Sequence, residues 1–194
     1  MQERHSTAYI VGNGKSRLKF NLRTVDDVVF GCNAIYRDFF PAYDLPHFLV
    51  AIDDGVIREI EQSYFPSKRV IIPSLDDRWE PFECNRNRPR SNAGINAMRE
   101  AVKLGYDNLI CLGFDFLLKD ETMMLSNVYD GTENYGEHTR ANKADNPGRI
   151  NYLKWFATAN ESVNIAFAFP NPMDMIDVNL NNVRSISLAS LQTQ

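Results

Sequence analysis

Short runs of consecutive apolar residues recur along the chain, with room for a helix between most of them. They lie at residues 7–11, 27–32, 47–52, 69–72, 108–113 and 163–169. A strand with one face in water alternates apolar and polar residues, whereas a continuous apolar run is typical of a strand buried on both faces. The pattern therefore predicts an α/β fold with an open, mostly parallel sheet and helices on both faces.

Two segments between these runs carry apolar residues at helical spacing. The first covers residues 94–104 and stops at Gly105, a common residue just past the end of a helix. The second covers residues 149–160 and follows Pro147, which we expect to set its start. Because no repeat or linker divides the sequence, we expect residues 1–194 to form a single domain.

Composition excludes some classes of partner. The formal net charge of -4 argues against general nucleic-acid binding, which needs a basic surface. The three cysteines form no CxxC pair, which favours a reducing compartment. The chain has no apolar stretch of about 18 residues and no secretion signal, so we expect no membrane span and a cytoplasmic location. The sequence is compatible with a homo-oligomer.

The first apolar run breaks into the glycine-rich turn Gly12-Asn13-Gly14. Such a turn after a buried strand can present backbone N–H groups to a phosphate, so a nucleotide is the first ligand to suspect. An ATPase P-loop is not indicated, because Tyr9 occupies the place of its first glycine. The dinucleotide fingerprint fails at Arg17, where a third glycine is needed. The alternative is a tight turn that requires positive φ and binds nothing.

Polar residues follow several of the predicted strands. In a parallel sheet, ligands bind at the carboxyl ends of the strands. The residues at these ends are Gly12, Asn13, Gly14, Asn33, Asp53, Asp54, Asp115 and Asn171. Each could instead cap a helix or shape a turn, but together they predict one binding site. Asparagine amides suit a nucleotide, because they donate to phosphate oxygens and accept from amino groups.

The adjacent carboxylates Asp53 and Asp54 have two interpretations. They could hold Mg²⁺ or Mn²⁺ against a pyrophosphate. Alternatively, Asp54 caps a helix that begins at Val56.

Residues 119–148 form a long polar segment with few apolar residues. A connection of this length inside a compact domain is often an active-site lid, with disorder as the alternative. Of the three histidines in the chain, His138 lies in this segment, where a general base could close over a ligand.

These features together resemble the bacterial single-domain sialyltransferases of glycosyltransferase family 42. That family has the motifs I-x-G-N-G-P-S, V-F-R-C-N, a helix that starts at glycine and ends A-x-x-L-G-Y, S-G-x-D-F and a final Pro-Asn. The corresponding positions here are residues 10–16 with Lys15 in place of proline, residues 29–33, Gly94 with residues 101–106, residues 112–116, and Pro170-Asn171. The order and spacing of these motifs agree with the family pattern over residues 8–175.

The resemblance implies a Rossmann-like nucleotide-sugar-binding fold with a lid-like segment at residues 119–148. It also implies a CMP-activated sugar as donor, a glycan as acceptor, and transfer with inversion without a metal ion or other cofactor. A lid histidine would act as base on the acceptor hydroxyl, and lid tyrosines would stabilise the departing phosphate. These roles pass to His138, Tyr129 and Tyr135. The implied substrate-binding residues are Gly12, Asn13, Gly14, Asn33, Asp54, Asn92, Gly94, Asp115 and Asn171.

The sequence departs from the family pattern in places. The hydroxyl-bearing pair before the helix glycine is Asn92-Ala93, so one donor to the ligand is missing. Leu117 stands where a tyrosine is expected, and His138 lies further from the following helix than the pattern requires. These changes affect the expected activity more than the expected fold.

Two other hypotheses stay open. The opening turn and strand pattern are also similar to nucleotide-dependent pyrophosphokinases of the archaeal pterin type, which would need Mg²⁺ on Asp53, Asp54 or Asp115. The departures from the family pattern instead suggest a nucleotide-binding module that has lost catalysis.

Overall fold

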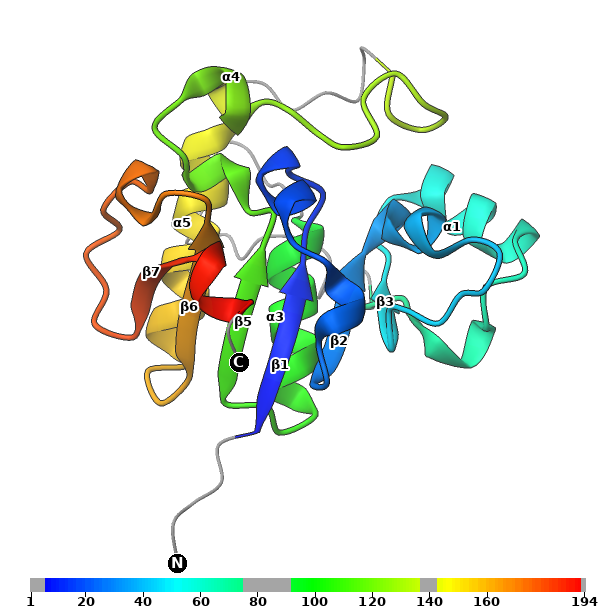
Figure 1. Ribbon diagram of the computed structural model, residues 1–194, viewed down its shortest axis with the longest axis horizontal. Helices are drawn as coiled ribbons and strands as arrows, with labels where there is room; N and C mark the ends of the chain where they lie inside the picture. Colours follow the sequence, from blue (N-terminus) through cyan, green and yellow to red (C-terminus); the bar gives the residue numbers. More distant parts are fainter. Residues whose placement is uncertain (1–5, 75–91, 137–142, 193–194) are drawn as a thin grey trace, which may run out of the picture.

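A computed structural model describes residues 6–74, 92–136 and 143–192 (Figure 1). Its sheet has seven parallel strands in the order β4-β3-β2-β1-β5-β6-β7. The strands are β1 Thr7–Val11, β2 Val28–Cys32, β3 Phe48–Val50, β4 Val70–Ile71, β5 Asn108–Leu112, β6 Asn164–Phe169 and β7 Val183–Ser187. The predicted α/β fold with an open parallel sheet is confirmed.

Each apolar run in the sequence contains a strand, but β7 was not predicted. Its sequence, Val-Arg-Ser-Ile-Ser, contains two apolar residues that are separated by polar ones, and so no run of consecutive apolar residues. At the edge of the described sheet it pairs with β6 and stays partly exposed. A search for continuous apolar runs, which detects strands buried on both faces, therefore passes over it.

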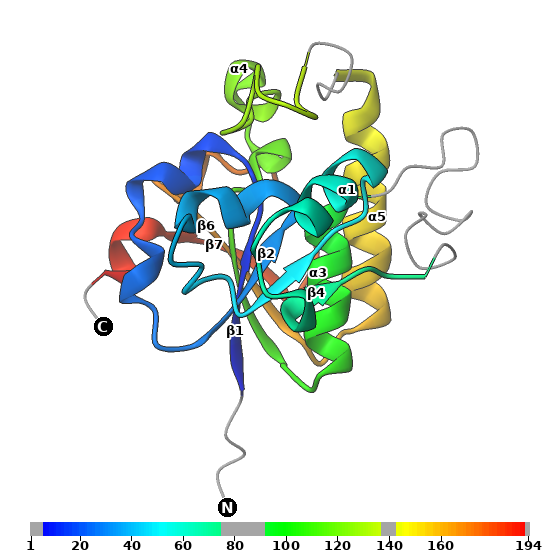
Figure 2. The same ribbon diagram turned by 90° about the vertical axis from the view of Figure 1, so that its right-hand side faces the viewer.

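Helices cover both faces of the sheet, as predicted (Figure 2). The α-helices of the described residues are α1 Asp54–Gln62, α3 Ala93–Lys103, α4 Glu121–Met124 and α5 Asn146–Ala159. Alternate residues of β1 enter separate hydrophobic clusters, because successive strand side chains point to opposite faces. Ala8 and Ile10 belong to the cluster that contains α3 and α5 residues. Tyr9 and Val11 belong to the cluster that contains α1 and the 3₁₀ helix η3 (Asn33–Phe39).

Helix starts differ in detail from the sequence-based predictions. Helix α3 begins at Ala93, and the side chain of Asn92 caps it by accepting a hydrogen bond from Ile95 N at 3.1 Å. Helix α5 begins at Asn146 rather than at residue 149, because Pro147 lies inside its first turn, where the missing N–H costs nothing. Helix α1 begins at Asp54, so the prediction that Asp54 caps a helix starting at Val56 was wrong.

The long polar segment at residues 119–148 is partly helical. Its described part contains α4, the 3₁₀ helix η7 (Lys143–Asp145) and the first residues of α5. Helix α4 lies beyond the carboxyl ends of the central strands (Figure 1). Among the described residues, no helix is both long enough and apolar enough to cross a membrane.

The glycines of the first turn are required by a close approach between β1 and β5. Gly12 N donates to Leu112 O at 2.8 Å, and Gly14 N donates to Gly113 O at 3.0 Å. A Cβ on Gly12 would lie 2.7 Å from Gly113 O, and one on Gly14 would lie 2.3 Å from Asp115 Cγ. Positive φ is found at Gly113 (+70°), not at either glycine of the turn.

This geometry corrects both sequence-based interpretations of the turn. The N–H groups of Gly12 and Gly14 already hold the end of β5, so they are not a phosphate cradle. The alternative, a tight turn that requires glycine because φ is positive, was wrong about the backbone conformation, because neither glycine adopts positive φ.

We predict that Gly12→Ala destabilises the protein by about 1–3 kcal/mol, because the new methyl group would push against a backbone carbonyl that cannot rotate away. The matched control is Gly136→Ala, since a Cβ there meets nothing within 4 Å. We expect this control to change the free energy of unfolding by less than about 0.5 kcal/mol. Urea denaturation measures both, and equal stability of the two variants would contradict the close-approach account.

Candidate functional site

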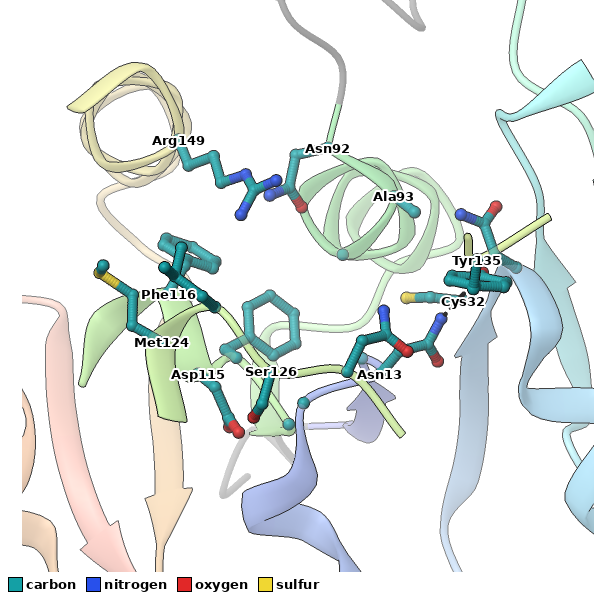
Figure 3. Close-up of a pocket in the computed structure, with 18 of the residues that line it drawn as sticks. Asn13, Cys32, Asn92, Ala93, Asp115, Phe116, Met124, Ser126, Tyr135 and Arg149 are labelled. Carbon is teal, nitrogen blue, oxygen red and sulfur yellow. Dashed lines mark hydrogen bonds between the residues drawn. The ribbon is translucent and has the colours of Figure 1, made fainter. Parts of the chain in front are cut away.

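A cavity of about 260 Å³ opens at the carboxyl ends of the central strands (Figure 3). Its wall is formed by the turn after β1, the ends of β2, β3 and β5, and the starts of α3 and α5. The wall is completed by the last residue of α4 and the segment after it, which contribute residues 124–127, Asp130 and Tyr135. The cavity therefore lies where the parallel-sheet rule places a ligand site.

Most of the predicted site residues meet at this cavity. Those that line it are Gly12, Asn13, Gly14, Asn33, Asn92, Gly94, Asp115 and Tyr135. Asp54, Tyr129 and Asn171 are not part of its wall, and His138 lies outside the described residues. The topology thus brings together side chains that are far apart in the sequence.

Asn13 presents an acceptor that no described residue satisfies. Its Nδ2 donates to the Tyr135 hydroxyl at 3.3 Å, whereas its Oδ1 is buried and receives no hydrogen bond. The Asn13 main-chain carbonyl accepts from Val128 N at 2.8 Å, which fixes the backbone of the turn. A buried acceptor without a donor costs about 1–3 kcal/mol, so a rotation of the Asn13 amide that brings Oδ1 to a ligand donor in the cavity would recover this free energy.

Asn33 is oriented by the end of β3. Its φ of 49° is a left-handed conformation that asparagine tolerates better than most residues. Its Oδ1 accepts from Ile52 N at 3.1 Å, and its Nδ2 donates to Asp53 Oδ2 at 2.5 Å. Because the oxygen faces a backbone donor, the amide nitrogen must face the carboxylate.

Two carboxylates on the cavity wall have different surroundings. Asp115 Oδ2 accepts from Ser16 N at 3.0 Å, and its Oδ1 accepts from the Ser16 hydroxyl. Within the described ranges, the carboxylate of Asp53 is held by Asn33 alone. Desolvation by the surrounding protein raises the pKa of both groups, because it disfavours the charged form, and the hydrogen bonds from Ser16 and Asn33 partly oppose this.

Tyr129 has a structural environment rather than a place on the cavity wall. Its hydroxyl donates to Asp38 Oδ1 at 2.8 Å and accepts from Arg17 Nη2 at 3.0 Å. Arg17 is 4% exposed and pairs with Asp38 Oδ2 at 2.8 Å. Burial raises the pKa of Tyr129, so the phenol stays protonated near neutral pH. The network joins three segments that are separate in sequence.

Asn171 and Asp54 lie outside the cavity wall, and each belongs to the start of a helix. Asn171 caps the 3₁₀ helix η8 (Pro172–Asp174), with Oδ1 accepting from Met173 N at 3.2 Å. Asp54 is an exposed residue in the first turn of α1. Their ligand-binding roles stay predictions.

The segment that contains Tyr135 is fixed to the body of the protein. Arg37 pairs with Glu59 and donates to Thr132 Oγ1 at 2.8 Å. Asn134 Nδ2 donates to Glu59 Oε2 at 2.8 Å. Residues 127–136, called the docked segment below, are therefore held over η3 and α1 by charged groups.

Arg149 is a cavity residue that the sequence did not reveal as one. It stands in the first turn of α5, and its side chain points toward Asn92 at the start of α3 (Figure 3). The sequence indicates a helix there, but which of its residues face the site depends on how α5 packs. Its guanidinium supplies positive charge for an anionic group of a ligand.

No group of three or more His, Cys, Asp or Glu side chains is placed to hold a metal ion in the part of the chain that the structure describes.

Comparisons with known proteins identify the fold. No protein-family model matches the sequence, and no curated protein matches it. Among solved structures, the sialyltransferase CST-II in complex with a trisaccharide acceptor and CMP superposes with a TM-score of 0.53 at 15% identity, covering 93% of this chain and 89% of that one. CST-II N51A in complex with CMP gives 0.52 at 15% identity, with the same coverage. The chain therefore shares the CST-II fold.

We predict that Tyr129→Phe lowers the free energy of unfolding by about 1.5–3 kcal/mol, because it removes hydrogen bonds to two charged groups inside the protein. Tyr64→Phe is the control, since Tyr64 is 91% exposed. Denaturant unfolding measures both changes. If Tyr129→Phe is as stable as the control, the Arg17–Asp38–Tyr129 network does not support the fold.

Proposed function

We propose that this protein is a sialyltransferase-like glycosyltransferase that binds a CMP-activated sugar in the cavity and transfers the sugar to a glycan acceptor. The observation that carries this proposal is Asn13, a residue of the cavity wall whose Oδ1 receives no hydrogen bond from the described residues. The cytosine amino group and the ribose hydroxyls of CMP are donors that could satisfy it. The shared fold with CST-II, whose structures contain CMP, supports the same nucleotide.

The proposed reaction is a displacement with inversion at the anomeric carbon. The acceptor oxygen forms a bond to this carbon as the bond to the phosphate oxygen breaks, and CMP leaves with the electron pair. Arg149 and Tyr135 are the cavity residues suited to stabilise the negative charge on the departing phosphate. We propose this stabilisation in place of a metal ion. The resemblance gives His138 as one candidate for the base and Tyr129 as one candidate for a phosphate contact.

A second candidate is a nucleotide-binding module without catalysis. The hydroxyl of Tyr129 is engaged by Asp38 and Arg17, and Leu117, where the family has a tyrosine, is fully buried. At the first position the hydroxyl is already engaged by the protein, and at the second the side chain has none. Neither residue can therefore donate a hydrogen bond to the donor phosphate. Nucleotide binding without transfer or donor hydrolysis over a panel of CMP-sugars would favour this candidate, and measurable transfer would exclude it.

We predict that CMP raises the melting temperature by about 5–10 °C at a concentration 100-fold above its Kd. Asn13→Ala is expected to weaken CMP binding about 10-fold, because a ligand donor loses its acceptor. Calorimetric titration measures the affinity, and Asn151→Ala, at an exposed position of α5, is the matched control.

Absence of any shift with CMP, UDP or GDP would contradict the proposal. A shift with ATP and Mg²⁺ that a chelator abolishes, without one for CMP, would instead favour a pyrophosphokinase.

A further inference from the structure

Transfer to a hydroxyl requires a group that accepts its proton. On the basis of the proposed function, we propose that Asp53 is this general base. Its carboxylate takes the proton of the acceptor hydroxyl while the acceptor oxygen bonds to the anomeric carbon, and the bond to the CMP phosphate breaks with its electron pair on the phosphate. Protonated Asp53, the glycosylated acceptor and CMP are the products of this step.

The other carboxylates on the cavity wall are already engaged. Asp115 holds Ser16 with both oxygens. Asp130 Oδ2 accepts from Asn127 N at 2.9 Å and lies 3.7 Å from Lys15 Nζ. A carboxylate that stabilises a turn or pairs with a cation is a weaker proton acceptor.

Asp53 differs from both of them. Only Oδ2 is held, by Asn33, and no residue in the described ranges donates a hydrogen bond to Oδ1. Asp53 is accessible from the cavity, so a ligand hydroxyl can reach it, even though the surrounding protein partly removes its carboxylate from water. Among the described carboxylates of the wall, Asp53 therefore has the capacity to accept a proton from a substrate.

Asn33 fixes the direction of this carboxylate. The hydrogen bond from Ile52 N to Asn33 Oδ1 prevents the amide from flipping, so Nδ2 always faces Asp53 Oδ2. A base held by such a partner loses less conformational entropy when the substrate arrives. Asn33 is accordingly a positioning residue, in addition to any contact with the donor.

The surroundings of Asp53 also favour proton uptake. Desolvation raises its pKa, and the neighbouring carboxylate of Asp54 on α1 acts in the same direction, against the hydrogen bond from Asn33. Among the described residues, Tyr135 of the docked segment is another titratable group that interacts with Asp53, and burial keeps that phenol neutral by raising its pKa. General bases with a raised carboxyl pKa work closer to neutral pH.

The test is a transfer assay with a CMP-sugar donor and a glycan acceptor on wild type, Asp53→Asn, Asp53→Ala and His138→Ala. Asp53→Asn keeps the size of the side chain and is expected to lower kcat by about 10²–10⁴-fold. Its CMP affinity, measured by calorimetry, should stay within about threefold of wild type. Formate should restore part of the activity of Asp53→Ala, which a purely structural role would not allow.

The matched control is Asp26→Asn, because Asp26 is exposed just before β2, at the amino ends of the strands and away from the cavity. Full transfer by Asp53→Asn, or loss of transfer only in His138→Ala, would overturn the assignment of the base and leave the proposed function intact. Absence of transfer by wild type over the whole donor panel would overturn the proposed function itself and, with it, the base.

Discussion

The close approach of the ends of β1 and β5 determines the shape of the site. Gly12 and Gly14 donate to the backbone at the end of β5, and Ser16 is held by Asp115. There is no room for a side chain at either glycine, so the turn can take only this path. As a result Asn13, between the two glycines, faces the cavity and offers its carbonyl to the docked segment.

The polar side chains of this site fall into two groups, those whose hydrogen-bonding atoms are engaged by the protein and those that keep an unbonded oxygen. Asp115 and Tyr129 are engaged by groups of the protein and stabilise the turn and the docked segment. Asn13 and Asp53 each keep an oxygen that the described residues leave unbonded. This division separates the residues that build the cavity from those that can act on a ligand, and it is the basis of the functional proposals.

Much of the fold could be predicted because buried parallel strands have a local signature in the sequence. The rule that ligands bind at strand ends also predicted one site for Asn13, Asn33 and Asp115, and they do line one cavity. Strand β7 was not predicted, because this edge strand contains no run of consecutive apolar residues. The surroundings of Tyr129 could not be predicted, since Arg17 and Asp38 reach it from distant segments. Arg149 was missed for a related reason, because its place depends on how α5 packs.

A crystal structure of the protein with CMP tests the central claim most directly. The account predicts that the nucleotide occupies the cavity at the ends of β1, β2, β3 and β5, with one of its donors within hydrogen-bond distance of Asn13 Oδ1. It also predicts that Gly12 N and Gly14 N keep their bonds to β5. A nucleotide bound elsewhere, or a phosphate held by the N–H groups of Gly12 and Gly14, would contradict it.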